Sequence, residues 1–244
     1  MATTKKKYIG SLKDLILFED DHIIVVNKPL DMASLDDKQA RNLIGLARKY
    51  HEDIQLCHRL DKNTSGVLLM AKDSESYRSM ALQFQKRQVE KTYLALVAGV
   101  HRFEEEEVDL PLLVSTNKRV TVNKQEGKKA TTLISSIESF RNFTLLSCKP
   151  LTCRIHQIRV HLKALGCPIA GDILYGGIDI MLSRLKRNYR SSNRKEEKPL
   201  NHGYLLHAHS LSFAHPHSGE KVSFTAEAPK NFQVVLKMLR KYNS

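Results

Sequence analysis

The chain has 244 residues, and its 39 Lys and Arg against 26 Asp and Glu give a formal charge of +13 and a pI of about 9.6. This excess of positive charge favours a polyanionic partner, either nucleic acid or an acidic membrane surface. No stretch approaches the roughly 20 apolar residues of a membrane-spanning helix, and the basic start MATTKKKYIG lacks the apolar segment that would make it a signal peptide.

The first hundred residues are predicted to alternate between strands and helices. In chain order, we expect a basic flexible tail at 1–14, a hairpin of two strands at 15–18 and 23–26, a helix at 36–50, a strand at 66–72, a helix at 74–88 and a strand at 90–99. Asp36 or Asp37 is expected to cap the first helix, and Ser74 the second. Tyr77 and Phe84 belong to an apolar stripe on the second helix, which is interpreted as a core-facing surface.

The second part of the chain is predicted to consist mainly of strands. In chain order, we expect strands at 118–123, 128–137 and 142–150, a helix at 154–166, strands at 205–216 and 221–229, and a final helix at 231–242. The acidic run at 104–107 is expected to be a solvated loop, and the basic segment 181–199 an insertion or mobile loop. Because strands predominate without a regular βαβ rhythm, the pattern indicates an α+β fold with a mixed, largely antiparallel sheet.

The stretch HRLDKNTSGVLLMAKD, residues 58–73, places one carboxylate among cations at the start of a predicted buried strand. Asp61 is either an ordinary turn acid paired with Arg59 or Lys62, or a carboxylate held in place for chemistry. Thr64 and Gly66 permit tight backbone packing, and the strand that follows would fix the loop to the core. These two features favour a positioned carboxylate.

A second polar cluster lies in CRIHQIRVHL, residues 153–162. On a helix, His156 and Arg159 share a face, as do Gln157 and His161. The apolar neighbours of Arg159 put its head group at the core boundary, where an arginine prefers a carboxylate partner.

Metal binding is not predicted. His156 and His161 diverge by about 140° on a helix of 3.6 residues per turn, and neither an H-E-x-x-H motif nor a C-x-x-C pair is present. His207 and His209 would share a strand face, but no carboxylate or Cys is arranged around them, so they are interpreted as surface or RNA-facing imidazoles. Without a signal peptide, the four Cys are expected to be reduced thiols in the cytoplasm.

Taken together, these motifs resemble the RluA-type pseudouridine synthases, the uridine isomerases of ribosomal and transfer RNA. The stretches that carry the resemblance are NKP (27–29), HRLDKNTSGVLLMAKD (58–73), KTYLALVAG (91–99), GKKATT (127–132), CRIHQIRVHL (153–162), GDILYG (171–176) and LHAHSLSFAHP (206–216). The resemblance extends from about residue 15 to residue 229. It implies the pseudouridine synthase α+β fold, with a cleft across a central mixed sheet flanked by helices, and one catalytic domain at 15–244 without a preceding S4-type RNA-binding module.

By resemblance, Asp61 is the nucleophilic carboxylate, Tyr93 the ring against the target base, and Arg159 the cation paired with Asp61. The residues expected to bind substrate are His58, Arg59, Thr64, Lys91, Arg154, His156, Gln157, Ile158, Arg184, Lys186, Arg187 and Arg190. The implied reaction breaks the N1–C1′ bond of uridine, turns the base and joins C5 to C1′, with the carboxylate attacking either C1′ or C6. It needs no cofactor or metal, and we expect a monomer that acts on RNA, with ribosomal RNA favoured over transfer RNA.

Two other functions remain open at this stage. The positive charge alone would equally suit a non-catalytic RNA-binding or ribosome-assembly factor. A hydrolase of glycosidic bonds would use Asp61 with a second acid, and Asp73 is expected about 20 Å away at roughly 3.3 Å per strand residue.

Neutralising Arg184, Lys186, Arg187 and Arg190 together is predicted to weaken RNA binding and to flatten its salt dependence. Each phosphate contact that is lost removes a share of the counterions released on binding, about 0.7 to 0.9 in the slope of log K against log salt concentration. Binding titrations at several salt concentrations measure the slope. An unchanged slope would contradict a phosphate-contacting role for this segment.

Overall fold

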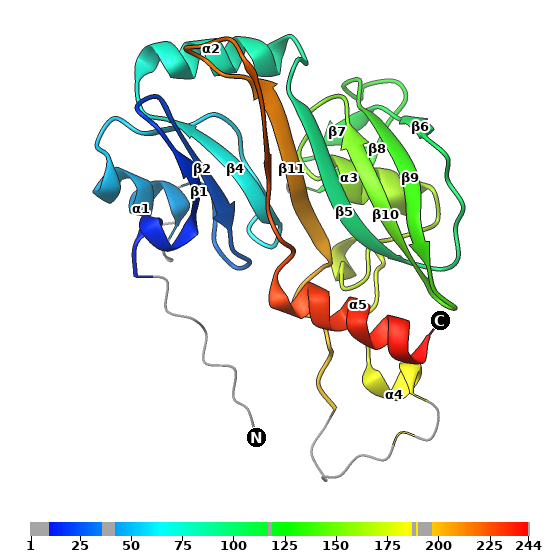
Figure 1. Ribbon diagram of the computed structural model, residues 1–244. Coiled ribbons are helices and arrows are strands. Elements are labelled where there is room, and N and C mark those ends of the chain that lie inside the picture. Colours follow the sequence, from blue (N-terminus) through cyan, green and yellow to red (C-terminus); the bar gives the residue numbers. More distant parts are fainter. Residues whose placement is uncertain (1–9, 36–41, 117–118, 187–188, 190–196, 244) are drawn as a thin grey trace.

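The computed structural model of the chain describes residues 10–35, 42–116, 119–186, 189 and 197–243. Within these residues, ten strands form one large sheet, which Figure 1 shows running across the molecule. Its strands are β1 (Ile16–Glu19), β2 (Ile23–Lys28), β3 (Gln55–Leu56), β4 (Ser65–Ala71), β5 (Glu90–Ala98), β6 (Glu106–Asp109), β9 (Thr131–Ser139), β10 (Phe143–Pro150), β11 (Leu206–Ala214) and β12 (Lys221–Thr225). The order along the sheet is β1-β2-β4-β11-β5-β10-β9-β6, with β3 beside β4 and β12 beside β11.

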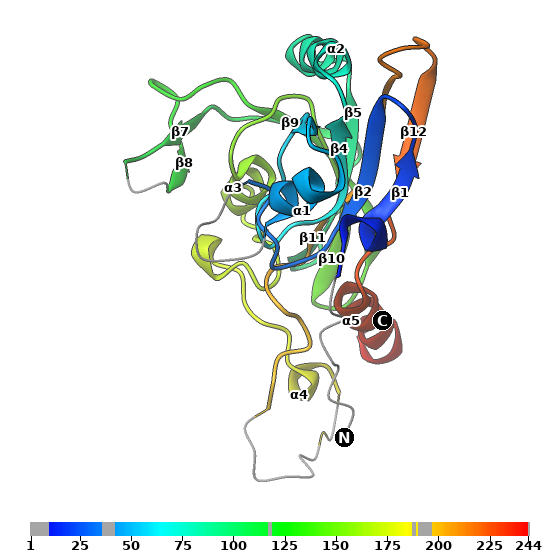
Figure 2. The same ribbon diagram turned by 90° about the vertical axis from the view of Figure 1, so that its left-hand side faces the viewer.

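A separate hairpin and several helices complete the described structure. β7 (Leu112–Val114) and β8 (Val120–Val122) form the hairpin, which projects from the body in Figure 2. The α-helices are α1 (Leu43–Tyr50), α2 (Ser74–Gln85), α3 (Gln157–Ala164), α4 (Leu182–Leu185) and α5 (Lys230–Tyr242), and the 3-10 helices are η1 (Leu12–Leu15) and η2 (Ile173–Tyr175). The expected α+β class, with a mixed and largely antiparallel sheet, is confirmed.

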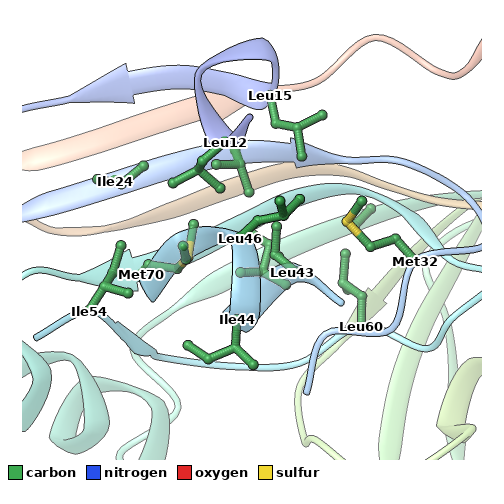
Figure 3. Packing of buried hydrophobic residues seen from close by; sticks show 14 residues of the cluster. Leu12, Leu15, Ile24, Met32, Leu43, Ile44, Leu46, Ile54, Leu60 and Met70 are labelled. Carbon is green, nitrogen blue, oxygen red and sulfur yellow. The ribbon is translucent and has the colours of Figure 1, made fainter. Parts of the chain in front are cut away.

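The alternation of side chains along the central strands divides the core into layers. On β2, Ile24 and Val26 face α1, whereas Ile23 and Val25 pack in the cluster that contains Met80 of α2. Figure 3 shows the first of these clusters, in which Leu43, Ile44 and Leu46 of α1 lie among strand and loop residues. Because successive strand residues point to opposite faces, a continuous apolar run such as IIVV is buried on both sides.

The same rule places α3 and α5 on opposite faces of the sheet. Ala95 and Val97 of β5 pack in the cluster of Ile158 from α3, while Leu96 packs with Phe232 of α5. Figure 2 shows α1 and α3 on one side of the sheet and α5 on the other. The side that carries α1 and α3 is also the side on which the polar motifs of the sequence meet.

The two halves of the sheet join where β11 pairs with β4 in parallel, with His207 opposite Ser65 and Ala208 opposite Gly66. Gly66 has φ of +118°, and a Cβ atom there would lie 2.0 Å from the carbonyl oxygen of Ala208. Only glycine therefore permits this approach. Ser65 Oγ and His207 Nδ1 add a hydrogen bond of 2.9 Å across the junction.

Several predicted helix boundaries were wrong. Asn42, not Asp36 or Asp37, caps α1, through a hydrogen bond from the backbone N–H of Gly45, and the two Asp residues lie outside the described part of the chain. Asp73 caps α2 in place of Ser74, since its carboxylate accepts from the N–H of Ser76.

Other expectations also need correction. Tyr77 of α2 is 37% exposed, so the core-facing stripe is narrower than predicted and centres on Met80. The helix expected from residue 154 begins at Gln157, because His156 has φ of +54°. Part of the acidic run forms β6, and the basic segment contains α4, whose Leu185 is buried. Within the expected tail, residues 1–9 lie outside the described part, but Leu12 is buried in η1.

Among the residues that the structure describes, none of the helices has the length and apolar character needed to cross a membrane.

Replacing Gly66 by Ala is expected to destabilise the fold by at least about 2 kcal/mol, because a side chain at this φ is strained and would also overlap the backbone of β11. Urea unfolding measures the loss. Gly219→Ala is the matched control, since Gly219 also has positive φ but a Cβ atom there meets nothing within 4 Å. Equal losses in the two variants would show that the close approach of β4 and β11 contributes nothing.

Candidate active site

Asp61 lies in a loop between β3 and β4 that is fastened on both sides. The buried ammonium of Lys28 donates hydrogen bonds to the carbonyl oxygens of Pro29, Met32 and Lys62, at 2.9, 2.9 and 3.2 Å. Ser34 bonds both the carbonyl and the N–H of Leu60, at 2.7 and 3.1 Å. Burial lowers the pKa of Lys28 to about 7, although the negative charges of Asp61 and Asp31 act to raise it.

Three side chains converge on one oxygen of Asp61. Its Oδ2 lies 3.3 Å from Nη1 of Arg159, 3.3 Å from the hydroxyl of Tyr204 and 3.7 Å from Nε2 of His156. Oδ1 makes no hydrogen bond to another described residue, and the side chain is 31% exposed. One oxygen is therefore held by the protein while the carboxylate still reaches the solvent-accessible cleft.

Arg159 is held more tightly by a second carboxylate. Its Nε and Nη2 donate to the two oxygens of Asp172, at 2.7 and 2.8 Å, and Asp172 is only 1% exposed. Burial alone would lower the pKa of Arg159, but the hydrogen bonds to Asp172 and the surrounding negative charge outweigh it and raise the pKa. The planar guanidinium donates hydrogen bonds to two carboxylates at once, an arrangement that a lysine ammonium does not reproduce.

Aromatic rings and an imidazole complete the network. The guanidinium carbon of Arg159 lies 4.3 Å from the ring centroid of Tyr204 and 4.8 Å from that of Tyr175. The Tyr204 hydroxyl is also 3.1 Å from Oγ1 of Thr64, and burial, followed by the charge of Asp61, raises the pKa of Tyr204. His156 Nδ1 is 2.7 Å from the Tyr175 hydroxyl, and burial is the main cause that lowers the pKa of His156.

A cleft opens beside Asp61, and most of the residues expected at the site line it. Those lining residues are Arg59, Asp61, Thr64, Lys91, Tyr93, Arg154, His156, Gln157, Ile158 and Arg159. Tyr93 projects from β5, and burial is the main cause that raises the pKa of its phenol. Gln157 holds the cleft wall in shape, since its side chain accepts from Thr152 Oγ1 and the Arg154 N–H and donates to Thr131.

Not all predicted substrate contacts lie in the cleft. His58 is absent from its lining. The Nε2 atom of His58 accepts the N–H of Leu69 at 3.1 Å, and burial, followed by the charge of Lys91, lowers the pKa of this histidine to about 3. Arg184 lies in α4 and Lys186 just after it, and neither lines the cleft. Arg187 and Arg190 lie outside the described residues.

Sequence reasoning missed the residues that hold Asp61 in place, namely Lys28, Asp172, Tyr175 and Tyr204. Asp172 stands in GDILYG, a motif noted without a role for its acid, and its position between small and apolar residues was an available signal. Tyr204 carried no local signal, since it lies 143 positions from Asp61 in the chain.

Two alternative chemistries find little support in this geometry. Asp172, the carboxylate nearest to Asp61 in the network, has both oxygens bound to Arg159 and is buried, so it is unavailable as the second acid of a glycosidase. Within the described ranges, no group of three or more His, Cys, Asp or Glu side chains is arranged to hold a metal ion. His207, one candidate, bonds Ser65 and the carbonyl of Ala226 instead.

Comparison with known proteins gives one consistent match. A family model described as RNA pseudouridylate synthase matches residues 22–164. Ribosomal large subunit pseudouridine synthase C of Escherichia coli K12 is 36% identical over 240 residues, which cover 95% of this chain and 72% of that protein. The protein of the same name from Yersinia pestis is 35% identical, over 98% of this chain and 73% of its own.

A solved structure agrees with the sequence matches. Human RNA pseudouridylate synthase domain containing 4 superposes with a TM-score of 0.70 and 26% identity, over 94% of both chains. The expected pseudouridine synthase fold is thereby confirmed. With a family model over more than half of its length, and bacterial relatives that match it almost from end to end, the chain belongs to the RNA pseudouridylate synthases, the isomerases that convert uridine in RNA to pseudouridine.

Proposed function

We propose that the chain isomerises uridine in ribosomal RNA, with Asp61 as the nucleophile. The observation that carries the proposal is the convergence of Arg159, Tyr204 and His156 on Oδ2 of Asp61 at the wall of a cleft that also contains Tyr93. The choice of ribosomal RNA is supported by the names of the bacterial relatives, which are ribosomal large subunit pseudouridine synthases.

In the proposed mechanism, the carboxylate of Asp61 attacks either C1′ of the ribose or C6 of the base. The N1–C1′ bond breaks, the base turns within the cleft, C5 forms a new bond to C1′, and the bond between Asp61 and the substrate is cleaved to restore the carboxylate. C5 then loses its proton and N1 gains one, so the product is an isomer of the substrate. Because the reaction changes no oxidation state and transfers no group to another molecule, the proposal includes no cofactor or metal.

The neighbours of Asp61 divide the remaining tasks. Arg159 orients the carboxylate through Nη1 and stabilises its negative charge when the bond to the substrate breaks. Tyr93 offers its ring to the flipped-out base. Because burial raises the pKa of Tyr93, its phenol stays protonated at neutral pH and serves as a surface rather than as a base.

RNA binding is assigned to cations that line the cleft, chiefly Arg59, Lys91 and Arg154. Side chains of this kind fix the position of a nucleic acid through its phosphates and carry no sequence information themselves. His58 is proposed to support the loop rather than to touch RNA, while Arg184 and Lys186 would contact phosphates away from the cleft. We further propose that the protein acts as a monomer in the cytoplasm, where ribosomal RNA is found.

Replacing Asp61 by Ala or Asn is expected to lower the rate of tritium release from RNA labelled at uridine C5 by about 10⁴-fold or more, since removal of a nucleophile leaves only binding and orientation. RNA affinity should stay within a few-fold of wild type, because the negative charge of Asp61 makes no attractive contact with RNA phosphates. The two measurements are made on the same preparations. Tritium release that persists in both variants would refute the assigned nucleophile.

Replacing Tyr204 by Phe is expected to lower kcat by about 10-fold to 100-fold, as for the loss of one hydrogen bond to a charged group, with little change in KM. The ring over Arg159 is retained, so only the hydroxyl contacts to Asp61 and Thr64 are lost. Thr64→Val removes the other partner of that hydroxyl and should give a smaller decrease. A Tyr204→Phe enzyme with wild-type kcat would show that the hydroxyl does not position Asp61.

A further inference from the structure

A second cavity opens next to the active-site cleft, between the end of α2 and the loop that joins β10 to α3. The two spaces adjoin along one wall, since both are lined by Lys91, Thr152, Cys153 and Arg154. The cavity has a volume of about 260 Å³, slightly below the range of about 300 to 1,000 Å³ that is typical of sites for drug-sized ligands. Its size therefore suits one nucleobase or ribose-phosphate unit.

The charge of this lateral cavity is positive and unneutralised. Arg87, Lys91 and Arg154 line it, and none of its lining residues is Asp or Glu. Among the described residues, the guanidinium of Arg154 donates to two neutral acceptors, the carbonyl oxygens of Lys129 and Cys153. The side chains of Lys91 and Arg87 make no hydrogen bond or ion pair with another described residue, although Lys91 is half-buried. Arg87 and Arg154 are exposed, and cations that meet no carboxylate at an open cavity fit a phosphate.

The same cavity also offers apolar surface. Phe84 contributes a half-buried ring from α2, and Leu151, on the loop that follows β10, is 44% exposed. Apolar and aromatic side chains beside cations are the combination that binds single-stranded nucleic acid, since every base has a face that can stack. In the cleft itself, Tyr93 provides the corresponding ring beside Lys91.

We infer that this lateral cavity binds the nucleotide next to the target uridine, with its base against Phe84 and Leu151 and its phosphate held by Arg87, Lys91 and Arg154. The inference rests on the proposed function, because it requires that the cleft hold a uridine of RNA. It adds that the enzyme binds two adjacent unstacked nucleotides, one in each space. Since stacking tolerates any base, the neighbouring nucleotide contributes affinity rather than sequence selection.

The test compares two RNA probes of equal length and charge, a 12-nucleotide oligouridylate and the same strand with every second residue abasic. In the second probe two adjacent bases never occur, so both spaces cannot be filled by bases at once. Fluorescence anisotropy should show that wild-type protein binds the alternating probe about 5-fold to 100-fold more weakly, as expected for the loss of one stacked base. In Leu151→Ala this difference between the probes should shrink by several-fold, because one of the two apolar contacts of the base is lost while Phe84 remains.

Leu82→Ala is the matched control, since Leu82 lies on α2 with 47% exposure and lines neither space. It should keep the wild-type difference between the two probes, and so should Asp61→Ala.

Arg87→Gln should lower the salt slope of oligouridylate binding by about 0.7, the share of one phosphate on a single strand. Wild-type binding that is equal for the two probes, or a Leu151→Ala protein that keeps the full difference, would overturn the inference. Tritium release from RNA labelled at uridine C5 is measured separately. A protein that discriminates between the two probes but releases no tritium would contradict the proposed function and leave the binding inference standing.

Discussion

The active site depends on one buried positive charge that is shared unequally between two carboxylates. Arg159 gives two of its donors to Asp172 and one to Asp61. One guanidinium and two carboxylates leave an excess of one negative charge in the network. Because Asp172 is 1% exposed and fully paired, whereas the Asp61 side chain is 31% exposed, the excess resides on Asp61 at the cleft. Removing Arg159 would leave the buried carboxylate of Asp172 without a counter-charge.

The sheet makes this arrangement possible because it brings distant segments to one point. The loop of Asp61 leads into β4, Tyr204 lies just before β11, and these two strands pair in parallel at the Gly66–Ala208 contact. Arg159 reaches the same point from α3, on the face that α1 also covers. The hydrogen bonds of Lys28 to Pro29, Met32 and Lys62 then fix the loop, so bonds to other chain segments position Asp61 in addition to its own turn, in which its carbonyl accepts from the N–H of Thr64.

The sequence predicted those parts of the fold and the site that leave a local pattern. Continuous apolar runs identified β2, β4 and β5, and the motifs around Asp61 and Arg159 identified the two residues that lie 3.3 Å apart. Helix caps were misplaced by one residue at Ser74 because Asp73 also satisfies the capping pattern. Tyr204 could not be assigned, since its role arises only when it meets Asp61, 143 positions away in the chain. His58 does not line the cleft, because adjacency to Asp61 in the chain does not decide which side of the loop its ring occupies.

The cations behind the large positive charge of the chain differ in whether they have partners within the protein. Lys28 and Arg159 are buried and fully engaged, the first by three carbonyl oxygens and the second by two carboxylates, so they stabilise the protein itself. Arg87 and Lys91 line the lateral cavity, and their side chains make no hydrogen bond or ion pair with another described residue; Arg87 is exposed and Lys91 is half-buried. A cation that folding leaves half-buried and unpaired costs free energy until an anion arrives. That cost favours binding of a phosphate beside Lys91, so under the proposed function the cations without a carboxylate partner mark the route of the RNA backbone more specifically than net charge does.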